Sequence, residues 1–308
     1  MLVLGGVLVP HALSAQVARA YAIVDHHTRY LVEGYNVDKK FPVASLTKVA
    51  TAMVVLDWAE RIKIDMNTRI VVPPSAGAIG GANPVGMRPG DAISLRDALY
   101  CALMASDNVS AETVAYFVGR DLLRRGGRGG DPVGYFVQQM NALAKQQGAR
   151  KTKFTNPHGL DHLKPVGYSS AGDMARMTIY ALNRSAFTFL ISQKARQVTY
   201  YRGGAARTFN LKNTNKLLGV ADIDGVKTGM TRKAGGCLIV SAKKKPLIKQ
   251  LPDGRTMLTK RRLIVVVLGS GDRFGVASRM LSKGWEKYEF WLDSGRPVEA
   301  GEILSAGS

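Results

Sequence analysis

Ser45 and Lys48 have the residue types and the spacing that nucleophilic catalysis requires. A serine hydroxyl is a weak nucleophile at neutral pH, so it needs a base within hydrogen-bonding distance. Residues three positions apart on a helix lie on the same face, which brings the Lys48 amine towards the Ser45 hydroxyl. Apolar residues at helical spacing run from Val49 to Trp58, with Pro42 upstream, so Ser45 is expected at a helix N-terminus. The segment predicts acyl transfer through Ser45.

The Ser-x-x-Lys spacing is weak evidence by itself, because Ser241 and Lys244 show it too. We expect this second match to lie on a strand and in the turn that follows it. The hydroxyl and the amine do not converge there, because neighbouring strand positions point to opposite faces. No role is assigned to the second match, and the case for Ser45 depends on other motifs.

Two further short motifs are candidates for partners of Ser45. Residues 106–108 (Ser-Asp-Asn) form a polar triplet inside an apolar run, which predicts a loop that breaks into a cleft between helices. Residues 227–229 (Lys-Thr-Gly) precede a strand and are expected at the edge of a sheet. Each motif alone would more often be structural than functional.

The elements that must position these residues follow from the hydrophobic pattern. Strands are expected near both chain ends, and mainly helices between them, from about residue 75 to 195. Strands at the two ends with helices between them predict one antiparallel sheet backed by helices. The expected elements are a hairpin of strands 20–24 and 30–35, helices including 95–104 and 175–182, neighbouring strands 236–242 and 262–269, and a closing helix 273–290.

In the order Ser-x-x-Lys, Ser-x-Asn, Lys-Thr-Gly, the three motifs together resemble those of the penicillin-binding proteins and serine β-lactamases. Four surrounding segments are similar to the low-molecular-mass D-alanyl-D-alanine carboxypeptidases. The resemblance covers roughly residues 18–290. The segments are 41–48 (FPVASLTK), 87–91 (MRPGD), 154–161 (FTNPHGLD) and 224–229 (DGVKTG).

This resemblance implies an α+β, serine β-lactamase/transpeptidase-like fold, with an antiparallel sheet from both chain ends, flanking helices and a helical subdomain. It also implies a serine-type carboxypeptidase that cleaves peptidoglycan stem peptides ending in D-Ala-D-Ala through an acyl-enzyme. β-Lactams, which mimic that peptide, would be covalent inhibitors. No cofactor and no metal is expected.

The resemblance carries catalytic roles over to four positions. Ser45 would attack the carbonyl of the penultimate D-alanine, and Lys48 would take its proton. Ser106 would relay a proton to the leaving D-alanine, while Asn108 would hold Lys48 and the substrate amide. A base must be neutral, and we expect burial and the like charge of Lys227 to lower the pKa of Lys48.

Substrate binding is assigned by the same resemblance to the second half of the chain. Lys227 and Thr228 would bind the terminal carboxylate, and Gly229 belongs to the same substrate-binding segment. The backbone N–H groups of Ser45 and Met230 would form an oxyanion hole.

Three departures from related families matter. Many of these carboxypeptidases have an arginine shortly before the Lys-Thr-Gly strand, but residues 213–218 contain none, so Arg232 is a further candidate for the carboxylate. No Glu-x-x-Leu-Asn segment occurs, which argues against a β-lactamase. A β-rich C-terminal domain and an amphipathic anchor are not recognised either, as in the soluble endopeptidases, so cleavage of peptide cross-links stays an alternative.

The chain is expected to have one main domain. Residues 1–16 resemble a secretory signal remnant, 17–291 form the D,D-peptidase domain and 292–308 a short tail. The protein is therefore expected to be exported to the periplasm or cell-wall space. For Cys101 and Cys237, two buried free thiols are favoured over one disulfide.

The formal charge of +20 favours an anionic partner. Peripheral contact with a membrane or an anionic wall polymer is one reading, with the basic clusters 243–245 and 260–262 bracketing one hairpin. The competing function is a non-catalytic basic protein that binds wall polymer or nucleic acid. The charge and the Arg-Gly segment 124–132 are the features that support this competing function. We interpret the segment as a flexible loop, so no nucleic-acid partner is expected.

Four histidines are weaker candidates. His158 and His162 are four positions apart, but the neighbouring proline and glycine make a helical zinc site improbable, and a structured loop at the cleft rim is favoured. His26 and His27 lie in an expected hairpin turn and are predicted to be solvated.

Overall fold

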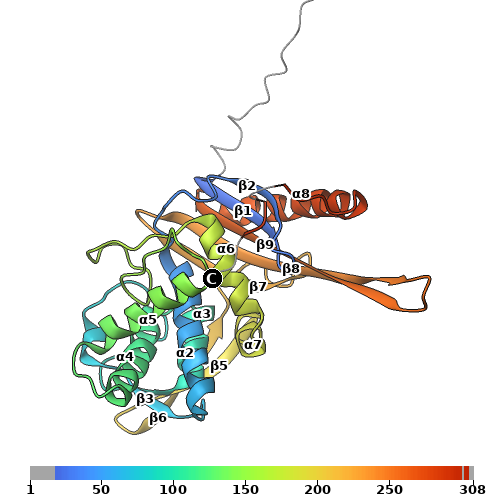
Figure 1. Cartoon of the computed structure of the whole chain (residues 1–308). Coiled ribbons are helices and arrows are strands. Elements are labelled where there is room, and N and C mark those ends of the chain that lie inside the picture. The colour runs from blue at the N-terminus through green and yellow to red at the C-terminus, as the bar shows by residue number, and fades with distance from the viewer. Residues whose placement is uncertain (1–17, 300–301, 305–308) are drawn as a thin grey trace, which may run out of the picture.

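The computed structural model describes residues 18–299 and 302–304. The expected signal segment, residues 1–16, lies outside the described residues, as do residues 300–301 and 305–308 of the expected tail. Figure 1 shows a sheet built from both ends of the chain, with a mainly helical lobe below it and a long two-stranded arm projecting to one side. Among the described residues, no helix has both the length and the apolar content needed to cross a bilayer.

The main sheet is antiparallel and has the strand order β2-β1-β9-β8-β7. The two ends of the chain therefore meet at its centre, where β1 pairs with β9 along its whole length. Residues 263–268 of β9 are an unbroken apolar run with no solvent exposure, as expected for a strand covered on both faces. The strands are β1 (Ala20–Asp25), β2 (Leu31–Tyr35), β7 (Ile223–Thr231), β8 (Gly235–Gln250) and β9 (Thr256–Ser270).

Helices cover both faces of this sheet. One face packs against α8 (Arg273–Asp293), whose Leu281, Trp285 and Tyr288 join a cluster with alternate side chains of the strands. The opposite face joins the larger core of the helical lobe, with α6 contacting β1 and β9. The lobe contains α2 (Lys48–Ile62), α3 (Leu95–Met104), α4 (Asn108–Arg125), α5 (Pro132–Gln146), α6 (Ala171–Leu182) and α7 (Ser185–Ile191).

The predicted α+β arrangement, an antiparallel sheet from both chain ends with a helical subdomain, is confirmed. A second sheet, of order β3-β4-β5-β6, was not predicted. Its first two strands have three residues each, too few to leave a period-two pattern. The strands are β3 (Arg69–Val71), β4 (Ala92–Ser94), β5 (Ala195–Arg202) and β6 (Ala205–Lys212).

Two local predictions need correction. His26 is buried, and burial lowers its pKa to about 4, whereas His27 is exposed as expected. Ser241 to Lys244 lie wholly on β8, because this strand continues to Gln250 without the expected turn. The two basic clusters bracket the outer β8–β9 hairpin, as predicted, with Lys243 opposite Arg262 and Lys244 opposite Arg261.

Both cysteines are buried free thiols, as the sequence analysis favoured. Burial raises the pKa of the Cys237 thiol to about 11 and holds the pKa of the Cys101 thiol well above its usual value. A thiol that stays protonated is a poor nucleophile, so neither cysteine competes with Ser45.

Candidate active site

Ser45 lies where the chain enters α2. A single 3-10 turn, η1 (Ala44–Thr47), carries it, and α2 begins at Lys48, so the predicted helix-start position is confirmed. Ala44 has a left-handed backbone with φ of 49°, which turns the chain sharply before the serine. The Ser45 side chain is half-buried, between the start of α2 and the neighbouring strand β7.

The Lys48 amine is fully buried and has three hydrogen-bonding partners. Nζ lies 2.9 Å from Ser45 Oγ, 2.7 Å from Asn108 Oδ1 and 3.1 Å from the carbonyl oxygen of His158. The amide and carbonyl oxygens can only accept hydrogen bonds. A neutral amine would donate its two N–H groups to them and keep its lone pair for the Ser45 hydroxyl. This arrangement can deprotonate Ser45.

Burial sets the protonation of Lys48. It lowers the pKa of the amine to about 7, against a smaller opposing effect from the charge of Asp107. The expectation that the like charge of Lys227 would add to this lowering is not met. Burial, the nearby Lys48 and Arg273 instead lower the pKa of Lys227 well below its usual value. A substantial fraction of Lys48 is therefore neutral near pH 7.

The Ser-Asp-Asn triplet forms the expected loop between two helices. Asp107 caps α4 by accepting a hydrogen bond from Ser110 N at 2.7 Å, and this starts the helix at Asn108. Ser106 has a left-handed backbone with φ of 60° and is half-buried. Its hydroxyl makes no hydrogen bond to the part of the chain that the structure describes, so it is available to a bound molecule.

The Lys-Thr-Gly segment lies on β7, which is an edge strand as predicted. Lys227 is 1% exposed, and its amine donates a hydrogen bond to the Thr228 carbonyl. The Thr228 hydroxyl lies 2.7 Å from that of Thr214. Gly229 lies against the catalytic turn, because a Cβ added there would stand 3.1 Å from the Ser45 backbone nitrogen. A side chain at this position would push the strand and the turn apart by a few tenths of an ångström, so glycine favours the close approach.

Met230, the next residue, is 65% exposed. The open side of an edge strand carries backbone groups without a strand partner. Just beyond Met230 a hollow of about 460 Å³ is lined by residues 160–162 and 231–233. The open edge of β7 and this hollow provide space for an extended peptide beside Ser45.

Arg273 is a functional candidate that the sequence analysis missed. It begins α8, and its guanidinium donates a hydrogen bond from Nη1 to the Gly229 carbonyl at 2.6 Å. Its Nε is buried without a partner among the described residues. Arg232, the earlier candidate, is exposed in the turn after β7. A cation in the first turn opposes the helix dipole, and that unfavourable placement was the available signal.

His158 contributes its backbone rather than a metal-binding ring. The residue is buried instead of lying at the rim, and its carbonyl accepts from Lys48. Burial lowers the pKa of its ring to about 3, and Nε2 faces Glu112 at 3.8 Å. The His162 ring contacts the carbonyl of Ile79, so the two rings have different partners.

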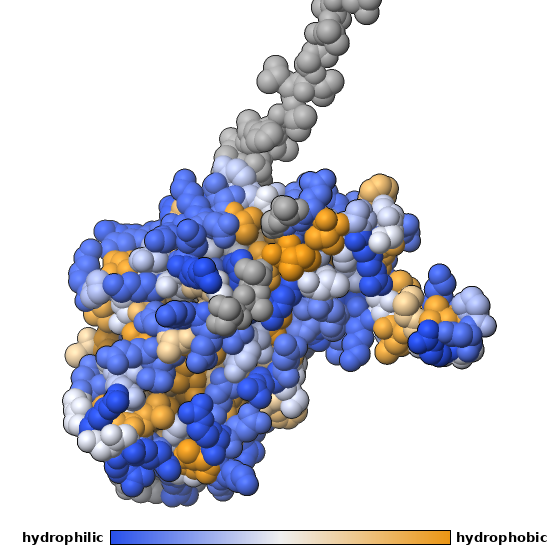
Figure 2. All heavy atoms as spheres, in the orientation of Figure 1, coloured by the Kyte–Doolittle hydropathy of each residue, from blue (hydrophilic) through white to orange (hydrophobic). Residues whose placement is uncertain are grey.

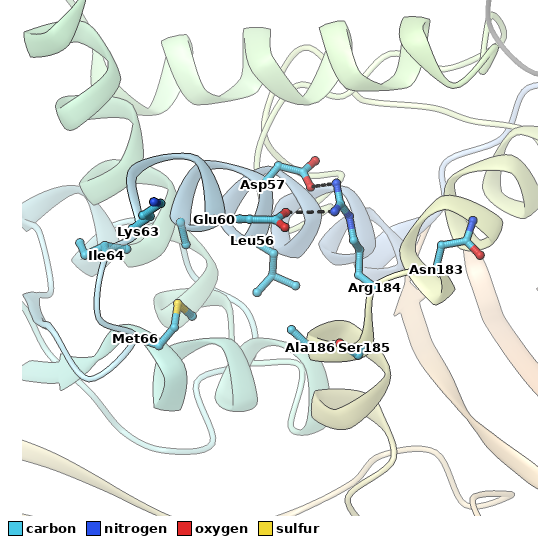
Figure 3. A pocket seen from close by; sticks show the side chains of 11 residues that line it. Leu56, Asp57, Glu60, Lys63, Ile64, Met66, Asn183, Arg184, Ser185 and Ala186 are labelled. Atoms are coloured by element: carbon cyan, nitrogen blue, oxygen red, sulfur yellow. Dashed lines mark hydrogen bonds and ion pairs between the residues drawn. The ribbon is translucent and has the colours of Figure 1, made fainter.

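A hollow of about 510 Å³ at the other end of α2 has no comparable chemistry (Figure 3). Arg184 points across it to Asp57 and Glu60, at 3.1 Å and 3.0 Å, so the charges of these three residues are paired with one another. From Lys48 to Lys63 the helix rises by about 20 Å, so this hollow is remote from Ser45.

Comparisons with known proteins agree with the motifs. The family model described as "D-alanyl-D-alanine carboxypeptidase" (Peptidase S11) matches residues 9–250. The chain is 28% identical over 279 residues to D-alanyl-D-alanine carboxypeptidase DacF of Bacillus subtilis, covering 89% of this chain but only 64% of that protein. It is also 28% identical to the D-alanyl-D-alanine endopeptidase of Escherichia coli, covering 91% of this chain and 79% of that protein.

A solved structure shows the same fold. Penicillin-binding protein D2 from Listeria monocytogenes, in its ampicillin-bound form, superposes with a TM-score of 0.68 at 24% identity, covering 87% of this chain and 97% of that one. The transpeptidase-like fold implied by the motifs is thereby confirmed.

The geometry predicts that the Lys48 amine titrates near pH 7. We expect this pKa in NMR titrations of the protein with ¹³Cε-labelled lysine, where loss of the signal in Lys48→Arg assigns it. Asn108→Asp places a carboxylate 2.7 Å from the amine and should raise the pKa of Lys48, because an opposite charge favours the ammonium form. Titration of Lys48 near pH 10.5, as in an unperturbed lysine, would contradict this description of the site.

Proposed function

The chain belongs to the D-alanyl-D-alanine carboxypeptidase family, and we propose that it removes the terminal D-alanine of peptidoglycan stem peptides through an acyl-enzyme on Ser45. The observation that carries this proposal is the buried Lys48 amine within hydrogen-bonding distance of the Ser45 hydroxyl, at 2.9 Å. A non-catalytic basic protein would have no use for a lysine that is buried at this cost.

In the first step Ser45 Oγ attacks the carbonyl carbon of the penultimate D-alanine while its proton passes to Lys48 Nζ. The neutral fraction of Lys48 grows as the pH rises through about 7, so acylation should accelerate over this range. The backbone N–H groups of Ser45 and Met230 stabilise the oxyanion. Gly229 supports this role, because it brings β7 against the Ser45 turn.

In the second step the C–N bond breaks and the amine of the leaving D-alanine takes up a proton through Ser106. The half-buried Ser106 hydroxyl has no competing partner among the described residues, which suits a relay. Asn108 keeps Lys48 in place and binds the substrate amide. Water then attacks the Ser45 ester, Lys48 again accepts the proton, and the shortened peptide leaves.

Recognition of the terminal carboxylate falls to Lys227, Thr228 and, we propose, Arg273. Burial and the like charges of Lys48 and Arg273 lower the pKa of Lys227, so the empty pocket disfavours the ammonium form of this lysine. An entering carboxylate removes that penalty and restores the ammonium form. The pocket therefore lacks a negative charge until the carboxylate binds. Arg273, whose guanidinium reaches the Gly229 carbonyl, adds a second cation near Lys227.

β-Lactams are proposed as covalent inhibitors, because they present a strained amide to the same serine. The ampicillin-bound relative supports this, since it shares the fold. Export to the periplasm or cell-wall space is proposed from the substrate, which lies outside the cytoplasm, and from residues 1–16. The charge of +20 further supports peripheral contact with an anionic surface there.

Cleavage of cross-linked peptides is the second candidate function. The similarity to the Escherichia coli endopeptidase favours it, and the same acyl-enzyme chemistry would serve both reactions. The two activities differ in the leaving group, which is free D-alanine in one case and the side-chain amine of a second stem peptide in the other.

We expect the purified protein to convert pentapeptide muropeptides to tetrapeptides. Mass spectrometry would show the loss of one alanine, and conversion of dimers to monomers would identify an endopeptidase instead. Ser45→Ala should lower product formation on the order of 10⁴-fold or more, because the nucleophile is lost. Ser241→Ala is the matched control and should leave the rate unchanged. Folded wild-type protein that forms neither product would refute the proposed function.

Arg273→Ala should raise KM about tenfold for a peptide ending in D-Ala-D-Ala, and Lys227→Ala at least as much, because each loses a charged contact with the carboxylate. Steady-state kinetics would be repeated on the same peptide with an amidated C-terminus. If carboxylate recognition is the cause, the variants and the wild type should process the amide equally slowly. An equal loss on both substrates would show that Arg273 is only structural.

A further inference from the structure

The outer part of the β8–β9 hairpin, residues 244–261, projects away from the body of the protein as an arm (Figure 1). The pairing of β7 with β8 ends at Ala242, and that of β1 with β9 ends at Leu263. Beyond these points the two strands pair only with each other within the described residues. A nine-residue strand segment spans roughly 30 Å, so the arm reaches well beyond the sheet.

The root of the arm is held by α8. Lys244 and Arg261 both contact Glu289, at 3.0 Å and 2.9 Å, and the Lys244 amine lies 4.7 Å from the centre of the Trp285 ring. These contacts fix the direction in which the arm leaves the sheet. Arg296, just after α8, also donates a hydrogen bond to Thr259 Oγ1 at 3.1 Å. Beyond Thr259 the described part of the arm is stabilised by its own pairing, which is marginal for an isolated hairpin in water.

The arm is strongly basic. It contains six lysines and arginines and one carboxylate, Asp253. Asp253 pairs with Arg255 in the tip turn, and Glu289 pairs with the two cations at the root. The remaining three, Lys245, Lys249 and Lys260, have no carboxylate within ion-pair distance in the described chain. Their charge favours an anionic partner.

Apolar side chains lie exposed among these charges. Ile248 and Leu258 are 68% and 52% exposed, and they are direct cross-strand partners, so they form one apolar step on the same face. Leu247 and Met257, also exposed, lie on the opposite face of the ribbon. Figure 2 shows hydrophobic and hydrophilic colour side by side on the projecting arm.

Protection against aggregation explains the lysines of the arm but not its exposed apolar side chains. Lysines on exposed strands commonly prevent edge-to-edge pairing, and Lys245, Lys249 and Lys260 would serve that purpose. The same logic forbids four large apolar side chains on a solvated ribbon, because such a segment is an aggregation hazard. The apolar pair of Ile248 and Leu258 on one face therefore needs a partner that accepts it together with lysines of the arm. A wall polymer offers anionic groups but no apolar layer.

We propose that the arm binds the surface of an anionic lipid bilayer. Ile248 and Leu258 would enter the boundary between headgroups and acyl chains, while the lysines contact anionic headgroups, as in other interfacial segments of mixed basic and apolar character. The proposal deepens the peripheral contact proposed above and rests on export of the chain, but it is independent of the chemistry at Ser45.

Arm binding would leave the catalytic strand accessible. In the β7–β8 register the arm continues from the Ile223 end of β7, whereas Gly229 and Met230 lie towards its other end. The arm would thus hold the protein at the membrane with the substrate edge turned away from the contact.

The test is co-sedimentation of the full chain with vesicles of phosphatidylcholine alone or with 30% phosphatidylglycerol. We expect at least tenfold stronger binding to the anionic vesicles, weakening as salt rises because headgroup contacts are screened. Ile248→Ser with Leu258→Ser should weaken binding at least tenfold. Lys245→Glu, Lys249→Glu and Lys260→Glu combined should abolish it.

Matched control variants change the same residue types elsewhere. Val71→Ser with Phe189→Ser removes two exposed apolar side chains, and Lys63→Glu, Lys151→Glu and Lys212→Glu combined reverse three exposed lysines. The apolar control should bind vesicles like the wild type. The lysine control should do so too, apart from the weakening that the same loss of positive charge causes wherever it is placed. All arm variants should hydrolyse a soluble D-Ala-D-Ala peptide at the wild-type rate. Loss of membrane binding and loss of the proposed activity can therefore be told apart.

Four results would overturn the proposal. The wild type could stay in the supernatant with anionic vesicles, or the arm variants could sediment like the wild type. The arm could also prove to be a self-association surface, in which case its apolar variants would lower the mass in solution and leave vesicle binding unchanged. Sedimentation with purified anionic wall polymer, but not with vesicles, equally counts against a bilayer.

Discussion

The burial of one amine is the constraint on which the site depends. Lys48 lies in the first turn of α2, and its side chain reaches oxygen atoms from three separate segments: the Ser45 turn, the start of α4 and the loop that holds His158. Removing an ammonium group from water is costly, so these segments must be held firmly enough to keep solvent out. The fold provides this by packing the helical lobe against a sheet made from both chain ends.

Close backbone approach completes the enclosure. A Cβ on Gly229 would meet the Ser45 turn, and one on Gly159 would stand 1.9 Å from the Ala44 carbonyl oxygen. The catalytic turn is thus enclosed between β7 and the loop 156–160. The contact at Gly159 requires glycine, and the one at Gly229 leaves little room for a side chain. The same close packing of β7 against the Ser45 turn brings Lys227 near Lys48. The lowered pKa of each lysine follows from a single packing arrangement.

The sequence predicted those parts of the site whose signal is local. Helix geometry places Lys48 beside Ser45. The composition of the segment around Lys-Thr-Gly predicts its edge strand. Arg273 was missed because it reaches Gly229 only through the packing of α8 on the sheet, which no local pattern records. His26 was misjudged for a related reason, since a hairpin turn is solvated only if nothing packs on it. The basic clusters predicted the hairpin between β8 and β9, but not that it projects beyond the sheet, because β-strand patterns carry no information on where a neighbouring strand ends.

The central claim is that Ser45 is the residue that becomes acylated. Intact-mass spectrometry after incubation with benzylpenicillin, followed by peptide mapping, measures this directly. We expect one stable adduct of the mass of the intact drug, located on Ser45 and formed faster as the pH rises through about 7. Folded protein that gains no mass, or an adduct on another residue, would show that Ser45 is not the acylated residue. A drug that is hydrolysed rapidly without leaving an adduct would indicate a β-lactamase instead.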